Sequence, residues 1–569
     1  MMPILAWAWV FTLPGLVLTA LGVPRHRRRA GYASLAGPVV LLIVAVVALV
    51  QGGSFSVTFP NWLPFLPDGA FEALADTLSA LMLAIVGFVA TLVYIYSLGY
   101  MADDPSRRRF FVFLDLFVAS MALLVLAGNL AVLLIGWTGV GISSFLLISF
   151  WRDKQGTLGA GLQALAANAI GDGALLLAAS MVPKGCGTLV TLSTPQCTTG
   201  LGGAEFLALL LFVAAAAKSA QGPLYFWLPN AMAGPTPISA LIHAATMVAA
   251  GVYLLVRTYA LLAAAPQVSL WIAVIGVATA IGASVAALFQ SNFKKGIAFS
   301  TVAQLGYMFA AVGVGASFAG LFHLFTHASF KALLFLAAGI VIHGASSHEE
   351  LADLRGLGRF FPFSRWGFLI GAASLMGIPL VTAGAFSKDD ILESVIGAQP
   401  ALGWLLVFAV VLTGAYIGRL FAIVYMARAR DPHAAHHDAS AERPMNWSLV
   451  PLMIGSIVLG WLGGWLSNAL AGPLGSAQPP PLLTVPGLIA AFLGVIGFGA
   501  AAWYVLRPQM VLPATITSYR PDRWVRTIAE GGYAVAAAVS RVQTGLLAMY
   551  AGVSLVAVAI ILLVRVSLR

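Results

Sequence analysis

The sequence predicts an all-α polytopic membrane protein with about 16 transmembrane helices. Two observations predict this class. Hydrophobic residues make up 60% of the 569 residues, charged residues only 9%, and the mean hydropathy is +0.95, so the chain has too little polar surface to cover a soluble globule. Apolar runs of about 20 residues, the length that crosses a bilayer, recur from one end of the chain to the other.

The apolar runs, taken in order, place the predicted spans at 3–22, 37–52, 77–97, 110–126, 129–150, 158–181, 204–228, 236–256, 268–290, 296–313, 317–344, 364–396 with a break, 401–427, 447–466, 484–506 and 544–566. We expect these spans to be organised as N-terminal spans with an aromatic-rich loop, a core, C-terminal spans, a short interfacial connection and a last span, with boundaries at 1–76, 77–430, 431–506, 507–543 and 544–569.

Basic residues predict how the spans are oriented. With the N-terminus outside, the loops after odd-numbered spans hold the basic clusters within 25–29, 107–109, 152–154, 294–295, 355–365, 428–443 and 507–541. The opposite loops and the C-terminus hold only Lys184, Arg257, Arg565 and Arg569. The positive-inside rule therefore predicts that both termini face the outer side of the membrane. The net charge of +10 is explained by these solvated cytoplasmic loops, and we expect no nucleic-acid partner.

Motifs for catalysis or tight metal binding do not emerge from the sequence. We find no glycine-rich phosphate loop on a strand, no clustered cysteines and no nucleophile triad, so we expect no catalytic residue, metal or cofactor in this chain. His433, His436 and His437 are weak metal ligands at most, and a solvated loop is the preferred interpretation. Cys186 and Cys197 lie in one outward loop, where an oxidising compartment favours a disulfide between them.

The stretch 210–257 concentrates features that an apolar packing role does not explain. Lys218 stands in an apolar span, where a charge costs several kcal/mol. The pair Gly222-Pro223 predicts a break in that helix, and a break at membrane depth is tolerated only where the freed backbone meets protein or water. His243 lies in the next span. These features together predict a path for protons or ions.

A second set of ionisable residues follows in the C-terminal half. His323, His327 and Lys331 are spaced i, i+4, i+8, which places them on one face of one helix. A single histidine in an apolar helix is more often a packed core residue, but two in line with a lysine favour proton transfer, because adjacent cations repel unless some are neutral. Lys388 stands beside Asp389 at a second predicted helix break, where a plain ion pair is the alternative.

Five long stretches carry a family resemblance: 96–151, 210–257, 292–309, 327–339 and 377–392. Together they resemble the large antiporter-like subunit of respiratory complex I, the NuoL type, in a superfamily that includes Mrp-type cation/proton antiporter subunits and DabB-type subunits of inorganic-carbon uptake systems. The resemblance implies two inverted five-helix repeats, each with a broken helix, and other membrane subunits as partners. In complex I it also implies NADH, FMN, iron–sulfur clusters and quinone, all bound by partner subunits.

The resemblance also implies roles for individual residues. Lys218 is then the lysine of the first broken helix, His243 the bridge that follows it, and Lys331 the central lysine. Lys388 and Asp389 form the terminal pair on the second broken helix. With His323 and His327, these residues make a line of buried side chains for protons along the middle of the membrane.

Two departures from the family pattern affect the first half of this line, and a third lies near the C-terminus. The family motif GWEGVG carries a glutamate that pairs with the first lysine, whereas residues 136–141 here read GWTGVG, with the neutral Thr138. The family often has an arginine where this chain has Ala169, three residues before Asp172. Asp172 is then the expected acidic neighbour of Lys218, and Asp115 is a second acid within a span. The connection before the last span, about 37 residues, is too short for the family's long lateral helix.

The leading hypothesis is therefore a proton-translocating membrane subunit of a complex I-type NADH:quinone oxidoreductase, without a redox site of its own. The alternatives are a DabB-type or Mrp-type subunit, favoured by Thr138, Ala169 and the short connection, and a membrane scaffold that no longer conducts. The sequence leaves open the complex, the driving reaction and the choice between proton and sodium.

Overall fold

The computed structural model describes residues 1–21, 30–60, 70–182, 186, 188–189, 192, 203–429, 435–436, 439–472, 474, 480–481 and 483–507. The predicted last span, 544–566, and all but the first residue of the predicted connection 507–543 lie outside the described residues. Residues 1–510 form one compact unit, and its fold is described below.

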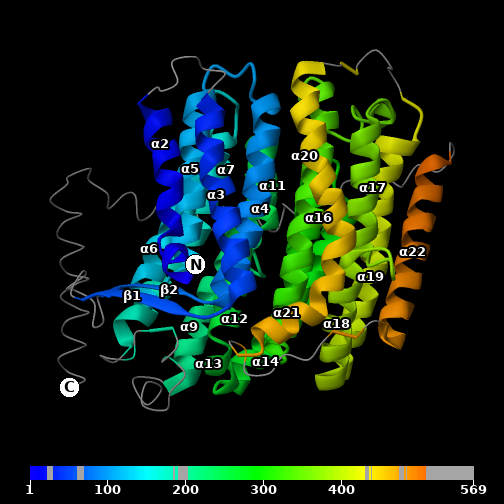
Figure 1. The fold of residues 1–569 in the computed structure, drawn as a ribbon. Helices are drawn as coiled ribbons and strands as arrows, with labels where there is room; N and C mark the ends of the chain where they lie inside the picture. The colour runs from blue at the N-terminus through cyan, green and yellow to red at the C-terminus, as the bar shows by residue number, and fades with distance from the viewer. Residues whose placement is uncertain are drawn as a thin grey trace, which may run out of the picture. The chain divides into compact units, whose positions relative to one another are not determined.

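The N-terminal half consists of helices and one short sheet (Figure 1). Its elements are α1 (Met2–Leu5), η1 (Ala8–Thr12), α2 (Leu13–Ala20), α3 (Ala30–Gln51), β1 (Phe55–Phe59), β2 (Phe71–Ala75), α4 (Thr77–Tyr100), α5 (Arg107–Val125), α6 (Leu130–Ile148), α7 (Thr157–Met181), α9 (Gly203–Lys218), α10 (Trp227–Asn230), η4 (Ala231–Ala233), α11 (Thr236–Ala244), α12 (Met247–Arg257) and α13 (Tyr259–Ala263).

In the described part of the C-terminal half, every secondary-structure element is a helix. Its elements are α14 (Pro266–Leu288), α15 (Phe293–Gly313), α16 (Ser317–Gly344), η5 (Leu357–Phe360), α17 (Pro362–Met376), α18 (Ala383–Ala398), α19 (Pro400–Phe421), a π-helical turn η6 (Ala422–Met426), α20 (Ala439–Val458), η8 (Leu459–Leu462), α21 (Gly463–Leu470) and α22 (Val485–Leu506).

The helices confirm a polytopic membrane protein. Within the described residues, 11 helical segments are long and apolar enough to cross a membrane. Helices also occupy the other predicted spans of this part, but they are short, broken or charged: α9 has 16 residues, and α5 begins with three arginines. The predicted number of about 16 spans and the inverted repeats therefore remain predictions.

The segment 53–76, predicted as an outward loop, contains a short antiparallel sheet. β1 and β2 pair antiparallel there, with Phe55 opposite Ala75 and Phe59 opposite Phe71. The sequence FSVTF is rich in aromatic and β-branched residues, which favour a pleated strand. The strand β2 alternates buried and half-buried residues, the period of two that marks a half-buried strand.

Three helix interruptions shape the interior. The predicted span 204–228 is too long, because α9 ends at Lys218, four residues before Gly222-Pro223. Ala220 adopts a left-handed φ of 50°, a conformation that cannot continue a right-handed helix. The second expected break is present between α17 and α18, where Gly377 has a φ of +84°. A third break, between α11 and α12, was not predicted.

The helix α16 lies at the centre of the helical packing. It packs against α11, α12 and α15 on the N-terminal side of the chain and against α17, α18 and α20 on the C-terminal side. Figure 1 shows it among upright helices, with α11 and α4 to one side, α17 to the other and α20 drawn alongside it. Because α16 carries the histidine–lysine series, this packing places those residues between the broken helices.

Candidate functional site

The first broken helix places Lys218 at its C-terminal end, fully buried. Its Nζ lies 3.8 Å from Oδ1 of Asp172 on α7 and 5.4 Å from the centre of the Trp137 ring on α6. A Cβ added to Gly141 would approach Nζ to 3.1 Å, so glycine leaves room for the ammonium group. The carboxylate and the π face of tryptophan are both favourable neighbours for a cation.

The two departed positions lie around this ion pair. Trp137 and Gly141, one helical turn apart, both approach Lys218, and Thr138 is half-buried between them on α6. Ala169 is exposed on α7. Asp172 is therefore the carboxylate that the structure brings to Lys218, with its side chain 22% exposed.

Side chains and packing satisfy the backbone freed by the first break. Ser219 donates its hydroxyl to the carbonyl of Val248, and Trp227 donates Nε1 to the carbonyl of Ala217. The amide of Gly222 donates to Oγ1 of Thr279. The start of the irregular segment, residues 219–221, is thus buried in protein, whereas Pro223 is exposed and residues 224–226 are half-buried.

His243 ends α11 at the unpredicted break before α12. It is fully buried, its ring packs 4.6 Å from the ring centre of Phe335, and neither ring nitrogen has a hydrogen-bond partner among the described residues. Unpaired buried imidazole nitrogens are costly, so this site has the chemistry of one that holds water or passes protons.

The α16 series lies on one buried face, as its spacing predicts. His323 contacts Oγ of Ser387 through Nδ1 at 2.9 Å and Oε1 of Gln304 through Nε2 at 3.0 Å. The ring centre of His327 lies 6.1 Å from that of His323, and its hydrogen-bond neighbour is the backbone of Ala244, at the end of α11. His323 is therefore held by side chains from two other helices, whereas His327 has no side-chain partner among the described residues.

Lys331 is fully buried one turn beyond His327. Its ammonium group donates to the hydroxyl of Ser300 on α15, and Ser300 donates in turn to the carbonyl of Ile297 at 2.6 Å. Among the described residues, no carboxylate forms an ion pair with Lys331. A lysine without a compensating anion at this depth is costly to keep charged, which suits a group that changes protonation.

The second broken helix holds Lys388 by a backbone group. Its Nζ donates to the carbonyl of Leu375 at 2.5 Å and lies 5.2 Å from the centre of the Tyr307 ring. Leu375 lies in the last turn of α17, where carbonyls lack helical partners and carry partial negative charge. The break thus supplies the acceptor that binds this buried cation.

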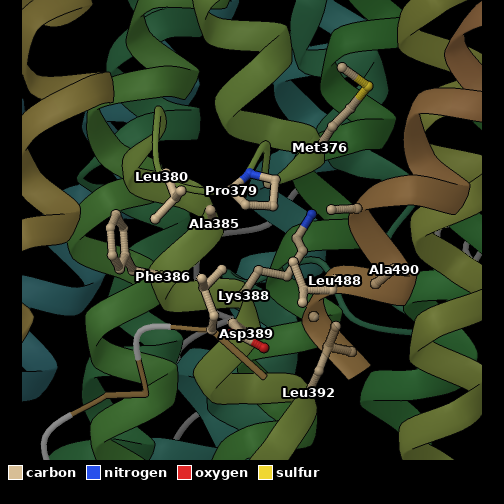
Figure 2. Close-up of a pocket in the computed structure, with 14 residues that line it drawn as sticks. Met376, Pro379, Leu380, Ala385, Phe386, Lys388, Asp389, Leu392, Leu488 and Ala490 are labelled. Carbon is tan, nitrogen blue, oxygen red and sulfur yellow. The ribbon is translucent and has the colours of Figure 1, made fainter. Parts of the chain in front are cut away.

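Asp389 turns away from Lys388, although it is the next residue. Its Oδ2 accepts from the backbone amide of Thr484 at 2.8 Å, and its Oδ1 accepts from the Thr484 hydroxyl. Figure 2 shows the amine of Lys388 and the carboxylate of Asp389 pointing in different directions. The two side chains therefore form no ion pair in this structure, because Lys388 is bound by Leu375 and Asp389 by Thr484.

A small pocket opens beside this pair, between the α17–α18 break and the start of α22. Lys388 and Asp389 line it together with apolar residues, among them Leu380 and Leu488 (Figure 2). Leu380 is 56% exposed and Leu488 46% exposed, so the pocket has an apolar rim at the protein surface.

Sequence reasoning missed the hydroxyl and amide groups that contact the cations. Ser300 and Gln304 reach Lys331 and His323 from α15, four residues apart on one helical face, and this spacing in an apolar span was an available signal. Asp115, whose depth the sequence leaves open, is fully buried and accepts from Ser34 at 2.6 Å and Tyr94 at 2.7 Å.

Two further predictions fall partly on undescribed residues. Cys186 is buried, but Cys197 lies outside the described residues, so their disulfide stays a prediction. His433 and His437 also lie outside the described residues, and His436 is exposed. The described part of the chain holds no group of three or more histidine, cysteine or acidic residues arranged to bind a metal.

The chain is similar to several known proteins. Residues 127–413 match the family described as NADH:quinone oxidoreductase/Mrp antiporter, and residues 68–111 match the N-terminus of complex I chain 5. NADH-quinone oxidoreductase subunit L of Escherichia coli (strain K12) is 36% identical over 547 residues, covering 92% of this chain and 87% of that protein. The subunit L of Mycobacterium tuberculosis (strain H37Rv) is 39% identical over 454 residues, 77% of this chain and 71% of its own.

Two other relatives are matched over a smaller share of their length. NADH-ubiquinone oxidoreductase chain 5 of Cryptococcus neoformans is 40% identical over 423 residues, which is 73% of this chain and 63% of that protein. A solved structure of the Mrp complex from Dietzia sp. DQ12-45-1b contains a chain that is 27% identical, with a TM-score of 0.78 over 99% of this chain and 63% of its own.

The fold and the site define a polytopic helical membrane protein with a buried line of lysines and histidines between broken helices. With the matches above, the chain belongs to the family of antiporter-like membrane subunits shared by NADH:quinone oxidoreductases and Mrp antiporters.

Proposed function

We propose that this chain is a proton-translocating membrane subunit of a complex I-type NADH:quinone oxidoreductase. One observation carries the proposal: His323, His327 and Lys331 line one fully buried face of α16. The likeness to subunit L of Escherichia coli, over 87% of that protein, supports this type of complex. The driving reaction belongs to partner subunits, which would hold NADH, FMN, iron–sulfur clusters and quinone.

The line extends in both directions from Lys331. His243 packs against Phe335, one turn beyond Lys331 on α16, and His323 contacts Ser387, the residue before Lys388. Like charges at low dielectric repel strongly, so gaining a proton at one group favours losing one at the next. An imidazole accepts and donates a proton through the two ends of one ring, which suits the histidines to link the lysines.

The central lysine gives the direct test. In proteoliposomes that contain the whole purified complex, we expect Lys331→Ala and Lys331→Met to abolish acidification coupled to NADH oxidation while the complex still assembles. Both residues suit a helix and remove a charge whose burial is costly. Lys295→Ala is the matched control, because Lys295 lies in the first turn of α15 and is only half-buried there. Normal pumping by both Lys331 variants would contradict the proposal and favour the scaffold hypothesis.

A second candidate function is that of an Mrp-type cation/proton antiporter subunit. It is favoured by the Mrp structure from Dietzia, which covers 99% of this chain, and by the neutral Thr138. A DabB-type role in inorganic-carbon uptake rests only on sequence departures. The chain purified with its native partners separates the three: flavin and iron–sulfur subunits indicate complex I, small membrane subunits alone indicate antiport, and a zinc-bearing soluble partner indicates carbon uptake.

The location of the chain follows from the same reading. We place it in a bacterial inner membrane with both termini on the outer side, supported by the basic clusters within 25–29, 107–109, 355–365 and 428–443. A protease site inserted within 428–443 should be cut from the cytoplasmic side only. Cys186 and Cys197 would then face the oxidising side, and ready labelling of both by thiol reagents without reductant would contradict their disulfide.

A further inference from the structure

Thr484 and Gly487, at the start of α22, form a binding site for the carboxylate of Asp389. We call this site the seat. Thr484 is the N-cap of α22, and its hydroxyl accepts from the amide of Gly487 at 3.1 Å while donating to Oδ1 of Asp389. The Thr484 amide donates to Oδ2 at 2.8 Å. An anion at the positive end of a 22-residue helix gains from unpaired amides and from the helix dipole together.

Gly487 makes this seat possible. A Cβ built on Gly487 would lie 1.9 Å from Oδ1 of Asp389, a distance at which either the carboxylate or the helix must move. The φ of Gly487 is not left-handed, so backbone conformation does not require glycine here. The space for the carboxylate is therefore the only demand at this position that the structure shows.

The neighbouring cation, Lys388, is bound at a helix end of the opposite partial charge. Lys388 donates to Leu375 at the C-terminal, negative end of α17, while Asp389 accepts at the N-terminal, positive end of α22. Two helix ends thus keep apart two adjacent side chains of opposite charge. The pocket that both side chains line leaves space beside them at the point where they separate.

We propose that the N-terminus of α22 is the alternative partner of Asp389 in the terminal proton step, with Thr484 and Gly487 as positioning residues. The proposal rests on the proposed function. An N–H bond of the Lys388 ammonium breaks as an O–H bond forms on Asp389, which leaves a neutral amine and a neutral acid. The neutral acid then releases its proton to water in the pocket, and the carboxylate returns to the amide and hydroxyl of Thr484.

The seat also sets the direction of the step. A neutral acid gains less from the helix dipole and from charge-assisted hydrogen bonds than a carboxylate does. Binding at α22 therefore favours the form of Asp389 that has already released its proton. Without this seat, the carboxylate turns to the adjacent Lys388 cation, and the ion pair holds both groups in their charged forms.

The test compares seat variants with matched controls in the whole complex in proteoliposomes. We expect Gly487→Ala and Thr484→Val to lower protons pumped per NADH by about tenfold, the size of one lost charge-assisted hydrogen bond, and Thr484→Ser to restore pumping. Gly499→Ala, in the same helix with open space around it, and Thr258→Val, whose hydroxyl bonds only within its own segment, should pump normally.

A spectroscopic readout separates positioning from packing. The infrared carboxylate band that disappears in Asp389→Asn should shift in Thr484→Val and return to its place in Thr484→Ser. Normal pumping and an unshifted band in Thr484→Val would overturn the proposal. If Gly487→Ala prevents assembly, the nearly isosteric Thr484→Val decides alone. Loss of pumping in Lys331→Ala together with silent seat variants would reject this inference and keep the proposed function.

Discussion

The two broken helices each end beside a buried lysine, but they compensate its charge by different means. Lys218 faces the carboxylate of Asp172 on a neighbouring helix, at 3.8 Å. Lys388 binds the backbone carbonyl of Leu375, and the carboxylate nearest to it in sequence, Asp389, is bound by another helix end. A carboxylate contact can change by moving a charge, whereas a helix carbonyl is fixed by the fold. In the first region, movement of the Asp172 carboxylate can thus change the protonation of Lys218. In the second region, the charged side chains exchange between binding partners that the fold holds in place.

The strongest way to break this comparison is to remove the carboxylate of the first region. We expect Asp172→Asn to lower proton pumping by at least about tenfold, nearly as much as Lys218→Ala, because each leaves one partner of a buried pair alone. The double variant should be no worse than either single one, since residues that act as a unit are not additive. Proteoliposome acidification per NADH measures all three. A silent Asp172→Asn would remove switching by this carboxylate from the first region.

A smaller effect is expected from restoring the family's glutamate. Trp137 and Gly141 both approach Lys218, so a longer acidic side chain at position 138, between them on α6, reaches toward the same ammonium group. We expect Thr138→Glu to restore part of the pumping that Asp172→Asn loses, and Thr138→Gln, of similar size but neutral, to restore none. Equal pumping by the two variants in that background would show that charge at position 138 has no influence on Lys218.

The positions of the buried lysines and histidines could be predicted from the sequence because burying a charge is costly. Lysines and histidines inside apolar runs are expensive, so their positions alone indicate a buried functional line, and the i, i+4 spacing on α16 indicates its shared face. The Asp172 contact was also within reach, because Asp172 is the nearest intramembrane acid that the departures at Thr138 and Ala169 leave.

The hydrogen-bond partners of Asp389 and Lys331 could not be predicted from the sequence, for a physical reason. Asp389 and Thr484 lie 95 residues apart, and Lys331 and Ser300 lie 31 apart, so only the packing of helices brings them together. A hydroxyl in an apolar helix usually bonds its own backbone, and this common outcome hides the few that reach another helix. The early end of α9 depends on the left-handed Ala220, which nothing in an alanine-rich run indicates.

A structural brace beside the first region offers a third test. Arg257, at the end of α12, binds Asp76 at the start of α4 through two contacts of 2.5 and 3.2 Å. Burial would raise the pKa of Asp76, but the charge and hydrogen bonds of Arg257 and the bonds from Ser79 outweigh it, so the pKa lies below its ordinary value of 3.8. We expect Arg257→Ala to destabilise the protein by about 1.5–3 kcal/mol in thermal unfolding.

The sign of the pH dependence follows from that lowered pKa. The ionised form of Asp76 is favoured in the folded state, so its stabilisation is full above 3.8 and is lost as the pH falls through the folded-state pKa. Arg257→Ala should therefore differ from the native protein near neutral pH and converge with it in acid. Asp353→Asn is the control, because its pair with His348 is exposed and should contribute about 1 kcal/mol or less. Equal unfolding temperatures for Arg257→Ala and the native protein at neutral pH would show that the brace contributes nothing.

The smallest effects are expected from substitutions of two glycines, Gly141 in the first region and Gly377 in the second. The first substitution should change pumping and the second should change stability. A Cβ at Gly141 would lie 3.1 Å from Nζ of Lys218, so Gly141→Ala should displace the ammonium by a few tenths of an ångström and change pumping with little change in stability. Gly377 has a φ of +84°, and a Cβ there would meet its neighbours, Lys388 among them, at ordinary van der Waals distances of 3.6–3.7 Å. Gly377→Ala should therefore cost about 1 kcal/mol through backbone strain alone. Pumping and thermal unfolding of both variants decide this. If Gly141→Ala lost stability while pumping normally, the space beside Lys218 would be a matter of packing, and the switch assigned to the first region would lose its geometric basis.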